Sequence, residues 1–207
     1  MADIVWPVDL RPMSQSFYLQ PHIGGAESPM TRTRKVYGLS APRWLTKLTF
    51  RHRAWGHGAE AEKSARIEAL IAEMQGGLNR AIIWDFRRDR SLRPQPIVAA
   101  PSAEATPRGS TQMAIGGFAP YSTVFLPGDY VGGDGRPHIV TARSIANASG
   151  VATVSFLPPL STDVPAGKAV LDTVSAPFRL TSDTAGLNDT TARQLTTFTL
   201  DFAEDLG

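Results

Sequence analysis

Histidines are the side chains in this sequence with which a metal site would most readily be built. His52 and His57 lie five residues apart, whereas His22 and His138 are isolated in the sequence. Zinc proteases use an HExxH motif, and other metal sites combine histidines with a carboxylate. Neither arrangement surrounds these histidines. We therefore interpret His52 and His57 as ordinary residues at a strand-to-helix turn.

Glycines and aspartates gather between Gly128 and Gly135, where the sequence reads GDYVGGDG. This is neither a Walker loop nor a dinucleotide-binding fingerprint, because no helix is expected after it. The spacing of a calcium-binding EF-hand also fails, since the terminal glutamate and the flanking helices are missing. Asp134-Gly135 is instead a common hairpin signal. The segment is predicted to form turns.

Scattered carboxylates leave one enzymatic alternative open. A β-jelly-roll glycosidase could bring two of them face to face from distant strands. Such an enzyme needs an aromatic-lined groove, but most aromatic residues of the second half alternate with polar ones, as core residues do: Phe118, Tyr121, Phe125, Tyr130, Phe156 and Phe178. The sequence also lacks a GxSxG nucleophile elbow. We expect no catalytic, cofactor-binding or metal-ligating residues and no enzymatic activity.

Composition narrows the class of protein further. The 207 residues contain no cysteine, which excludes disulfides, thiolate zinc sites and cysteine nucleophiles. No apolar run approaches the roughly 18 residues of a transmembrane helix. The first residues, MADIVWPVDLRP, lack the basic and apolar regions of a secretory signal. We expect synthesis in a cytoplasm and no membrane insertion.

Charge is distributed unevenly along the chain. Residues 1–93 carry fifteen Lys and Arg against nine Asp and Glu, or +6, and residues 94–207 carry six against ten, or −4. One basic cluster comprises Arg32, Arg34 and Lys35, and another comprises Arg87, Arg88, Arg90 and Arg93. A nucleic-acid binder would place stacking aromatics within such a patch. Solvated faces, or opposite charges that meet between subunits, are the alternative interpretation.

Periodicity predicts a first module made of strands and one helix. Extended segments are expected at Ser16–Leu19, Thr31–Leu39, Arg43–Arg53 and Ala81–Phe86, with a loop at Pro21–Gly25. In the third of these, Trp44, Thr46, Leu48 and Phe50 share one face. Residues 59–75 change to helical period, with Ile67, Leu70, Ile71, Met74 and Leu78 on one stripe and Gly76-Gly77 as the stop.

The second half is predicted to be all β. Residues 87–110 are rich in Pro, Arg and Ser, which is typical of a linker or of an excursion into a second module. Residues 111–181 are expected to form five to seven short strands, including a hairpin of Tyr130-Val131 with His138–Thr141 and a strand at Val151–Phe156. After a polar loop at 181–191, LTTFTLDF at 195–202 predicts a strand that returns to the first sheet. The expected modules are 1–90 with 192–207, and an inserted module at 91–191.

One long segment carries a resemblance to a known family. GDYVGGDGRPHIVTARSIANASGVATVSFLPPL at 128–160, continued by Val164–Gly167 and Ala176–Leu180, resembles tail-tip proteins of long-tailed, siphovirus-like phages and of gene transfer agents. The order of elements around it is similar to that of the distal tail protein family. The similarity of plan covers nearly the whole chain, whereas the motifs span about a quarter of it.

The resemblance implies a fold and a function. The implied fold is mainly β: a ring-forming β-sandwich with one flanking helix, and an inserted small β-barrel of OB or galectin-like type. The implied function is that of a structural baseplate subunit of the virion, located at the tail tip. It would form a homohexameric ring between the tail tube protein and the hub proteins, and DNA and the tape measure would only pass through its lumen.

Two points remain open in the sequence. The inserted module could instead be a carbohydrate- or receptor-binding adhesion module at the same tail tip, which would require an exposed aromatic patch. Ring contacts are predicted on the strand Thr31–Tyr37, with Arg32, Arg34 and Tyr37 as the subunit-interface residues. A ring is a heterologous assembly, so complementary charges on two different surfaces would suit it.

Overall fold

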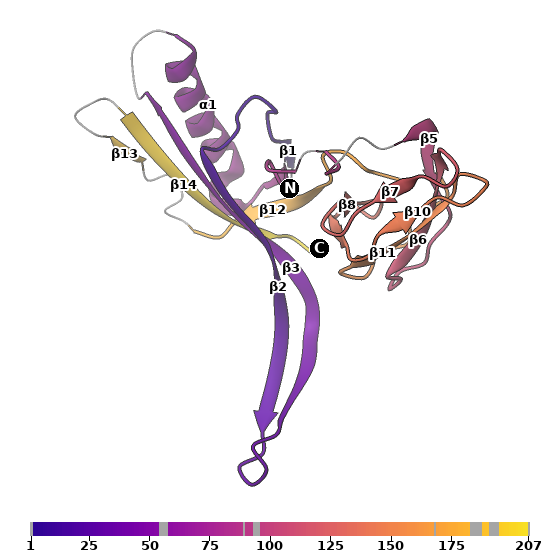
Figure 1. The fold of residues 1–207 in the computed structure, drawn as a ribbon. Coiled ribbons are helices and arrows are strands. Elements are labelled where there is room, and N and C mark those ends of the chain that lie inside the picture. Colours follow the sequence, from indigo (N-terminus) through magenta and orange to yellow (C-terminus); the bar gives the residue numbers. More distant parts are fainter. Residues whose placement is uncertain are drawn as a thin grey trace. The chain divides into compact units, whose positions relative to one another are not determined.

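The computed structural model divides the chain into two compact units. Unit 1 comprises Met1–Ile82 and Pro177–Gly207, and unit 2 comprises Ile83–Ala176. The structure describes residues 2–53, 58–88, 90–92, 96–167, 169–182, 188–190 and 195–206. The architecture is mainly β with one α-helix, which confirms the predicted fold class (Figure 1).

Unit 1 is built on a seven-stranded sheet with the strand order β1-β4-β12-β14-β3-β2, in which β13 also pairs with β14. The strands are β1 (Asp3–Val5), β2 (Ser14–Glu27), β3 (Arg34–Arg53), β4 (Arg80–Trp84), β12 (Ser175–Leu180), β13 (Asn188–Thr190) and β14 (Leu195–Glu204). β1 and β4 run parallel, whereas β14 is antiparallel to both β3 and β12. The prediction that the closing strand returns to the first sheet is therefore confirmed.

One face of this sheet forms the core of unit 1. Phe50 lies opposite Phe198 and Leu48 opposite Leu200, and all four side chains are buried. Trp44 continues the buried row on β3, as the alternation predicted. Lys47 and other polar side chains lie on the opposite face, which is more exposed. The period of two along β3 and β14 thus sets which face of the sheet is buried.

The helix α1 (Ala59–Met74) packs against β3, close to the predicted range 59–75. Ile67, Leu70 and Met74 are buried, as the apolar stripe predicted. Leu78 was expected on the same stripe but is 60% exposed, because the backbone turns left-handed at Gln75 and ends the helix. In the part of the chain that the structure describes, no helix is long and apolar enough to cross a membrane.

β2 and β3 correct two sequence-based predictions. Pro21–Gly25 lies inside the continuous strand β2, so the predicted loop is wrong, and the two extended segments predicted around Ala41 form the single strand β3. The register between the strands shifts between Gln20 and His22. Pro21 lies within this irregularity, where the ladder does not require a backbone N–H. Pro21 is therefore accommodated within the strand without ending it.

Unit 2 contains a five-stranded sheet in the order β5-β6-β11-β9-β8, and a separate pair of strands, β10 and β7. The strands are β5 (Ile97–Ala103), β6 (Gln112–Phe118), β7 (Thr123–Phe125), β8 (Tyr130–Val131), β9 (His138–Val140), β10 (Ser144–Ile145) and β11 (Ala152–Leu157). The antiparallel pairing of β8 with β9 confirms the hairpin predicted across Gly132–Gly135. β5 lies in the proline-rich stretch 87–110, so that part of the stretch is no linker but belongs to the second module, the other interpretation that the sequence allowed.

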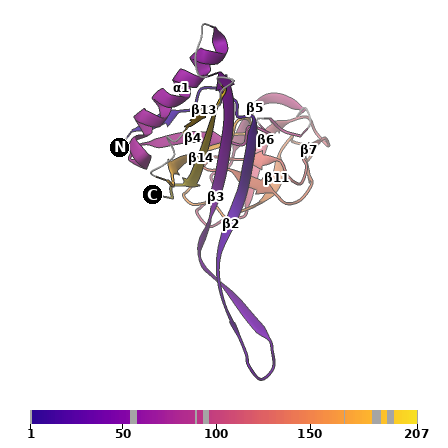
Figure 2. The same ribbon diagram turned by 90° about the vertical axis from the view of Figure 1, so that its left-hand side faces the viewer.

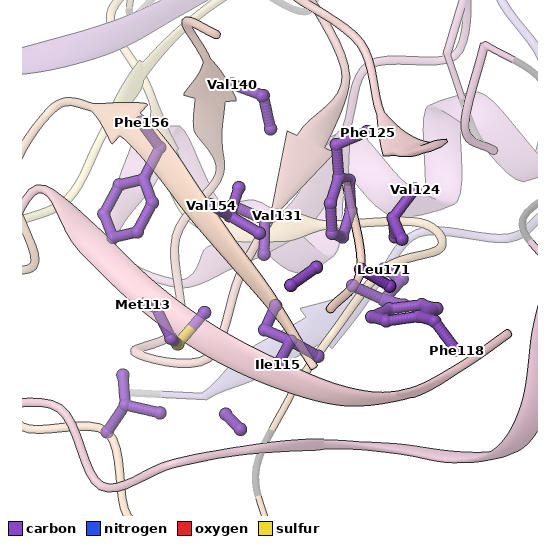
Figure 3. Packing of buried hydrophobic residues seen from close by; sticks show 14 of the residues in the cluster. Met113, Ile115, Phe118, Val124, Phe125, Val131, Val140, Val154, Phe156 and Leu171 are labelled. Carbon is purple, nitrogen blue, oxygen red and sulfur yellow. The ribbon is translucent and has the colours of Figure 1, made fainter. Parts of the chain in front are cut away.

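Apolar side chains from strands of both sheets meet inside unit 2 (Figure 3). Phe118 and Phe125 pack edge to face with their ring centroids 5.8 Å apart. Ile115 and Val154 lie between these two rings and the pair Met113 and Phe156 on the other side of the core. Both Ile115 and Val154 are fully buried. An apolar core of this kind is what holds a module of short strands together.

The observed unit boundaries differ from the predicted ones at 91 and 191. Unit 2 begins earlier, at Ile83, and Asp85 just after β4 accepts a hydrogen bond from the hydroxyl of Tyr130 within this unit at 3.1 Å. It ends earlier because Phe178 and Leu180 on β12 pair with Glu204 and Phe202 on β14 in the sheet of unit 1. Both differences arise from contacts between residues distant in sequence.

Candidate functional site

The β2–β3 hairpin extends well beyond the sheet of unit 1, as the two perpendicular views show (Figures 1 and 2). We call its protruding part, residues 21–42, the arm. All of its residues are exposed except Gly24, Ser28 and Pro42, which are partly exposed. Among the strands that the structure describes, β2 pairs only with β3, so no further strand of unit 1 covers the outer edge of β2 along the arm. A two-stranded ribbon alone in water is at best marginally stable, so such an arm is expected to be covered in use.

Large apolar side chains occur along the whole arm. Ile23, Val36, Tyr37 and Leu39 are each between 53% and 56% exposed, and Met30 at the tip is 93% exposed. Single exposed apolar residues are normal on protein surfaces, but a contiguous series of them marks an interaction site. The arm is therefore the strongest candidate functional surface among the described residues.

Both faces of the arm carry such residues. Gly25 lies opposite Val36 and Ile23 lies opposite Gly38, which places Ile23 and Val36 on one face. Tyr37 points to the other face, where its ring covers Gly24 so closely that a Cβ at Gly24 would lie 2.8 Å from it. A partner could consequently contact the arm from either side.

The three predicted interface residues all lie on the arm. Arg32 has a φ of 53° and lies in the tip turn, which closes through hydrogen bonds from Arg32 N to Ser28 O and from Ser28 N to Thr33 O. Arg34 begins β3 opposite Glu27, and Tyr37 follows on the same strand. The structure thus brings Arg32, Arg34 and Tyr37 onto one exposed element, and their role as subunit contacts stays a prediction.

Sequence reasoning missed the apolar members of this surface on β2. The sequence predicts a loop at Ile23, because Pro21 and the glycines at 24 and 25 signal a turn. The usable signal was the absence of any buried-face alternation between Ile23 and Leu39. An extended segment whose sequence shows no buried face either does not form a strand or forms one that another molecule covers.

A hollow of about 470 Å³ lies where the arm joins the sheet of unit 1. It is lined by Gln20, Pro21, His22, Ser40, Ala41, Arg43 and Leu206. His22 Nδ1 lies 2.6 Å from the hydroxyl oxygen of Ser40, and Arg43 donates to the side-chain oxygen of Gln20 at 3.2 Å. The polar side chains that line this hollow thus bind one another in two pairs, His22 with Ser40 and Arg43 with Gln20.

His52 belongs to a small ion-pair cluster at the start of α1. Its Nδ1 lies 3.0 Å from Glu60, and Lys63 binds the other oxygen of the same carboxylate at 3.0 Å. These two hydrogen bonds lower the pKa of Glu60. His57 lies outside the described residues. Within the described ranges, no group of three or more His, Asp or Glu side chains is placed to hold a metal ion.

In unit 2 the buried side chains of Asp134 and His138 lie beside the half-buried Ser161, the three residue types of a catalytic triad. Ser161 Oγ donates to Asp134 at 2.8 Å, and not to the imidazole. His138 directs Nε2 to Asp134 at 2.8 Å and Nδ1 to the carbonyl oxygen of Pro158 at 2.7 Å. A nucleophile must be hydrogen-bonded to its base. The cluster therefore connects the β8–β9 turn and strand β9 to the segment that follows β11, and it provides no activated hydroxyl.

Two comparisons with known proteins complete the description of these sites. No protein-family model and no curated protein matches the chain.

Proposed function

We propose that this chain is a structural subunit of a phage-type tail tip, a distal tail protein that forms a hexameric ring between the tail tube and the hub. The ring would leave a lumen for DNA and the tape measure, and the protein would act in the virion after synthesis in the bacterial cytoplasm. The proposal joins the resemblance of residues 128–180 to one structural observation. That observation is the arm, which is exposed along its length and apolar on both faces.

The arm supports an assembly role because of its unpaired edges. Among the described strands, β2 pairs only with β3, and β14 pairs with β3 no nearer to the tip than Leu45. Two rows of backbone N–H and C=O groups therefore face solvent on the arm. Long exposed edges lead to uncontrolled aggregation unless a defined partner covers them. Subunits of a closed ring can cover one another's edges.

A carbohydrate-binding module at the tail tip is less well supported. Such a module needs exposed aromatic rings for stacking, yet Phe118, Phe125 and Phe156 are buried in unit 2. Tyr121, at 75% exposed, is the one aromatic side chain in the described part of unit 2 that is mostly exposed. A single ring does not make a platform, which favours the scaffold role.

Mass measurement tests the proposal directly. We expect light scattering to give a six-subunit mass and negative-stain images to contain rings with a central opening. A control variant, in which residues 23–39 are replaced by Asn-Gly, should remain folded and monomeric, because this turn joins the paired residues His22 and Ser40. A monomeric wild-type protein that binds glycans on an array would refute the proposal.

A further inference from the structure

We propose that the arm of one protomer binds the outer face of α1 on a neighbouring copy of this chain. The inference rests on the proposed function in so far as both require self-assembly. It goes further, because it names both contact surfaces and the order in which subunits follow one another. It also does not depend on the number of subunits.

The outer face of α1 is small, acidic and turned away from its own core. Ala65, Ala69 and Ala72 are exposed and recur at helical spacing. Glu62 and Glu73 lie on the same stripe at either end of this row, and both are exposed. The buried residues Ile67, Leu70 and Met74 occupy the opposite side of the helix. The short alanine side chains let another backbone approach α1 closely, with a carboxylate at each end.

The arm has the complementary character. It carries three cations, Arg32, Arg34 and Lys35, against one acid, Glu27. All four residues are exposed. The apolar side chains beside them, such as Val36, would cover the alanines of α1, and the cations would reach the carboxylates. Complementary charges of this kind guide association and select a register.

The two surfaces lie at opposite ends of unit 1. β3 runs from the tip of the arm through the sheet to the end where α1 packs beside it (Figures 1 and 2). An arm therefore cannot reach the α1 of its own chain without a reversal of β3. Two different surfaces at opposite ends produce head-to-tail association, which closes into a ring if the rotation per subunit allows it. A second copy is the occupant that this geometry and these charges favour.

Charge reversal in pairs provides a test that unfolding cannot mimic. The arm variant is R32E/R34E and the helix variant is E62K/E73K. Each should be folded but should lose assembly, so that the concentration needed for half assembly rises about tenfold or more. The control variant R51E/R108E makes the same change in net charge as the arm variant, at two exposed cations outside both surfaces, and it should assemble like the wild type.

Rescue separates this contact from a general charge effect. The quadruple variant R32E/R34E/E62K/E73K should assemble again, because its arm and helix are again opposite in sign. An equimolar mixture of the arm variant and the helix variant should also assemble, with the two kinds alternating. The read-out is sedimentation velocity at low and at high salt, and high salt should weaken assembly.

The outcomes distinguish this inference from the proposed function. If both double variants assemble like the wild type, or if neither rescue restores assembly, the arm–α1 contact is refuted and a hexameric ring can still stand. If the rescue succeeds but the assemblies are open filaments or rings of another size, the contact stands and the hexameric ring is refuted. A wild-type protein that stays monomeric at all concentrations tested refutes both.

Discussion

Replacing Asp134 by Asn should weaken unit 2 far more than its small change in size suggests. The carboxylate is fully buried and accepts hydrogen bonds from His138 Nε2, Ser161 N and Ser161 Oγ, each at 2.8 Å, and from Arg136 N at 3.3 Å. His138 lies between two oxygen atoms, with Nε2 2.8 Å from Asp134 and Nδ1 2.7 Å from the carbonyl oxygen of Pro158. An amide in place of the carboxylate removes the negative charge and turns an N–H₂ toward one of these donors.

The pKa of Asp134 sets the magnitude of the effect. Burial alone would raise this pKa, but the hydrogen bond and charge of His138 and the hydrogen bonds from Ser161 lower it from 3.8 to about 2. At about 1.4 kcal/mol per pKa unit, the ionised carboxylate stabilises unit 2 by roughly 2.5 kcal/mol. We therefore expect D134N to cost about 3 kcal/mol at pH 7, since breaking a buried pair also strands its partner.

Hydrogen exchange measured by mass spectrometry can follow unit 2 separately. The protection of backbone amides in β9 and β11 against exchange should fall about 100-fold in D134N. This follows from the cost of about 3 kcal/mol, because about 1.4 kcal/mol corresponds to each factor of ten. β3 and β14 in unit 1 serve as internal controls. The matched variant D163N, at an exposed aspartate that accepts one backbone hydrogen bond from Arg108, should change protection of β9 and β11 much less.

Acidification should remove the stabilisation that the ionised Asp134 provides. The folded pKa of Asp134 lies below the unfolded value, so its stabilisation is complete above about pH 4 and is lost as the pH falls through about 2. The difference between wild type and D134N should therefore shrink over that range. A protection of β9 in D134N within twofold of wild type at pH 7, or a difference that does not shrink in acid, would refute this account.

Three further substitutions test local packing, each by urea denaturation. Gly150→Ala should lower the free energy of unfolding by at least about 2 kcal/mol more than Gly109→Ala. Both glycines have positive φ, but a Cβ at Gly150 would lie 2.3 Å from the carbonyl oxygen of Phe118, whereas a Cβ at Gly109 would meet nothing within 4 Å. Equal costs would contradict the clash. Ser64→Ala should stabilise unit 1 by about 0.5–1 kcal/mol. The buried hydroxyl of Ser64 has no hydrogen-bond partner among the described residues, and alanine favours the helix. A loss of stability would argue against this reasoning. Glu204→Ala should cost about 1–3 kcal/mol, because the buried carboxylate accepts a backbone N–H of β3 at 2.8 Å, and an unchanged midpoint would show that water replaces it.

Local periodicity predicted the elements that have one buried face. The strands β3 and β14 alternate between apolar and polar residues, and α1 repeats its apolar residues at helical spacing. The hairpin across Gly132–Gly135 follows from turn chemistry. In each case the information lies within a few consecutive residues, and the structure agrees with it.

The arm and the buried cluster of unit 2 depended on the tertiary structure. Pro21 and its glycines signal a turn in sequence, and only pairing with β3 places them in a strand, where the register shift tolerates the missing N–H. Asp134 and Ser161 are 27 residues apart, and their contact depends on how the loops of unit 2 fold over its core. The sequence by itself therefore determined the faces of individual elements. The tertiary structure decided which element lies exposed beyond the core, because exposure depends on what else in the chain can reach it.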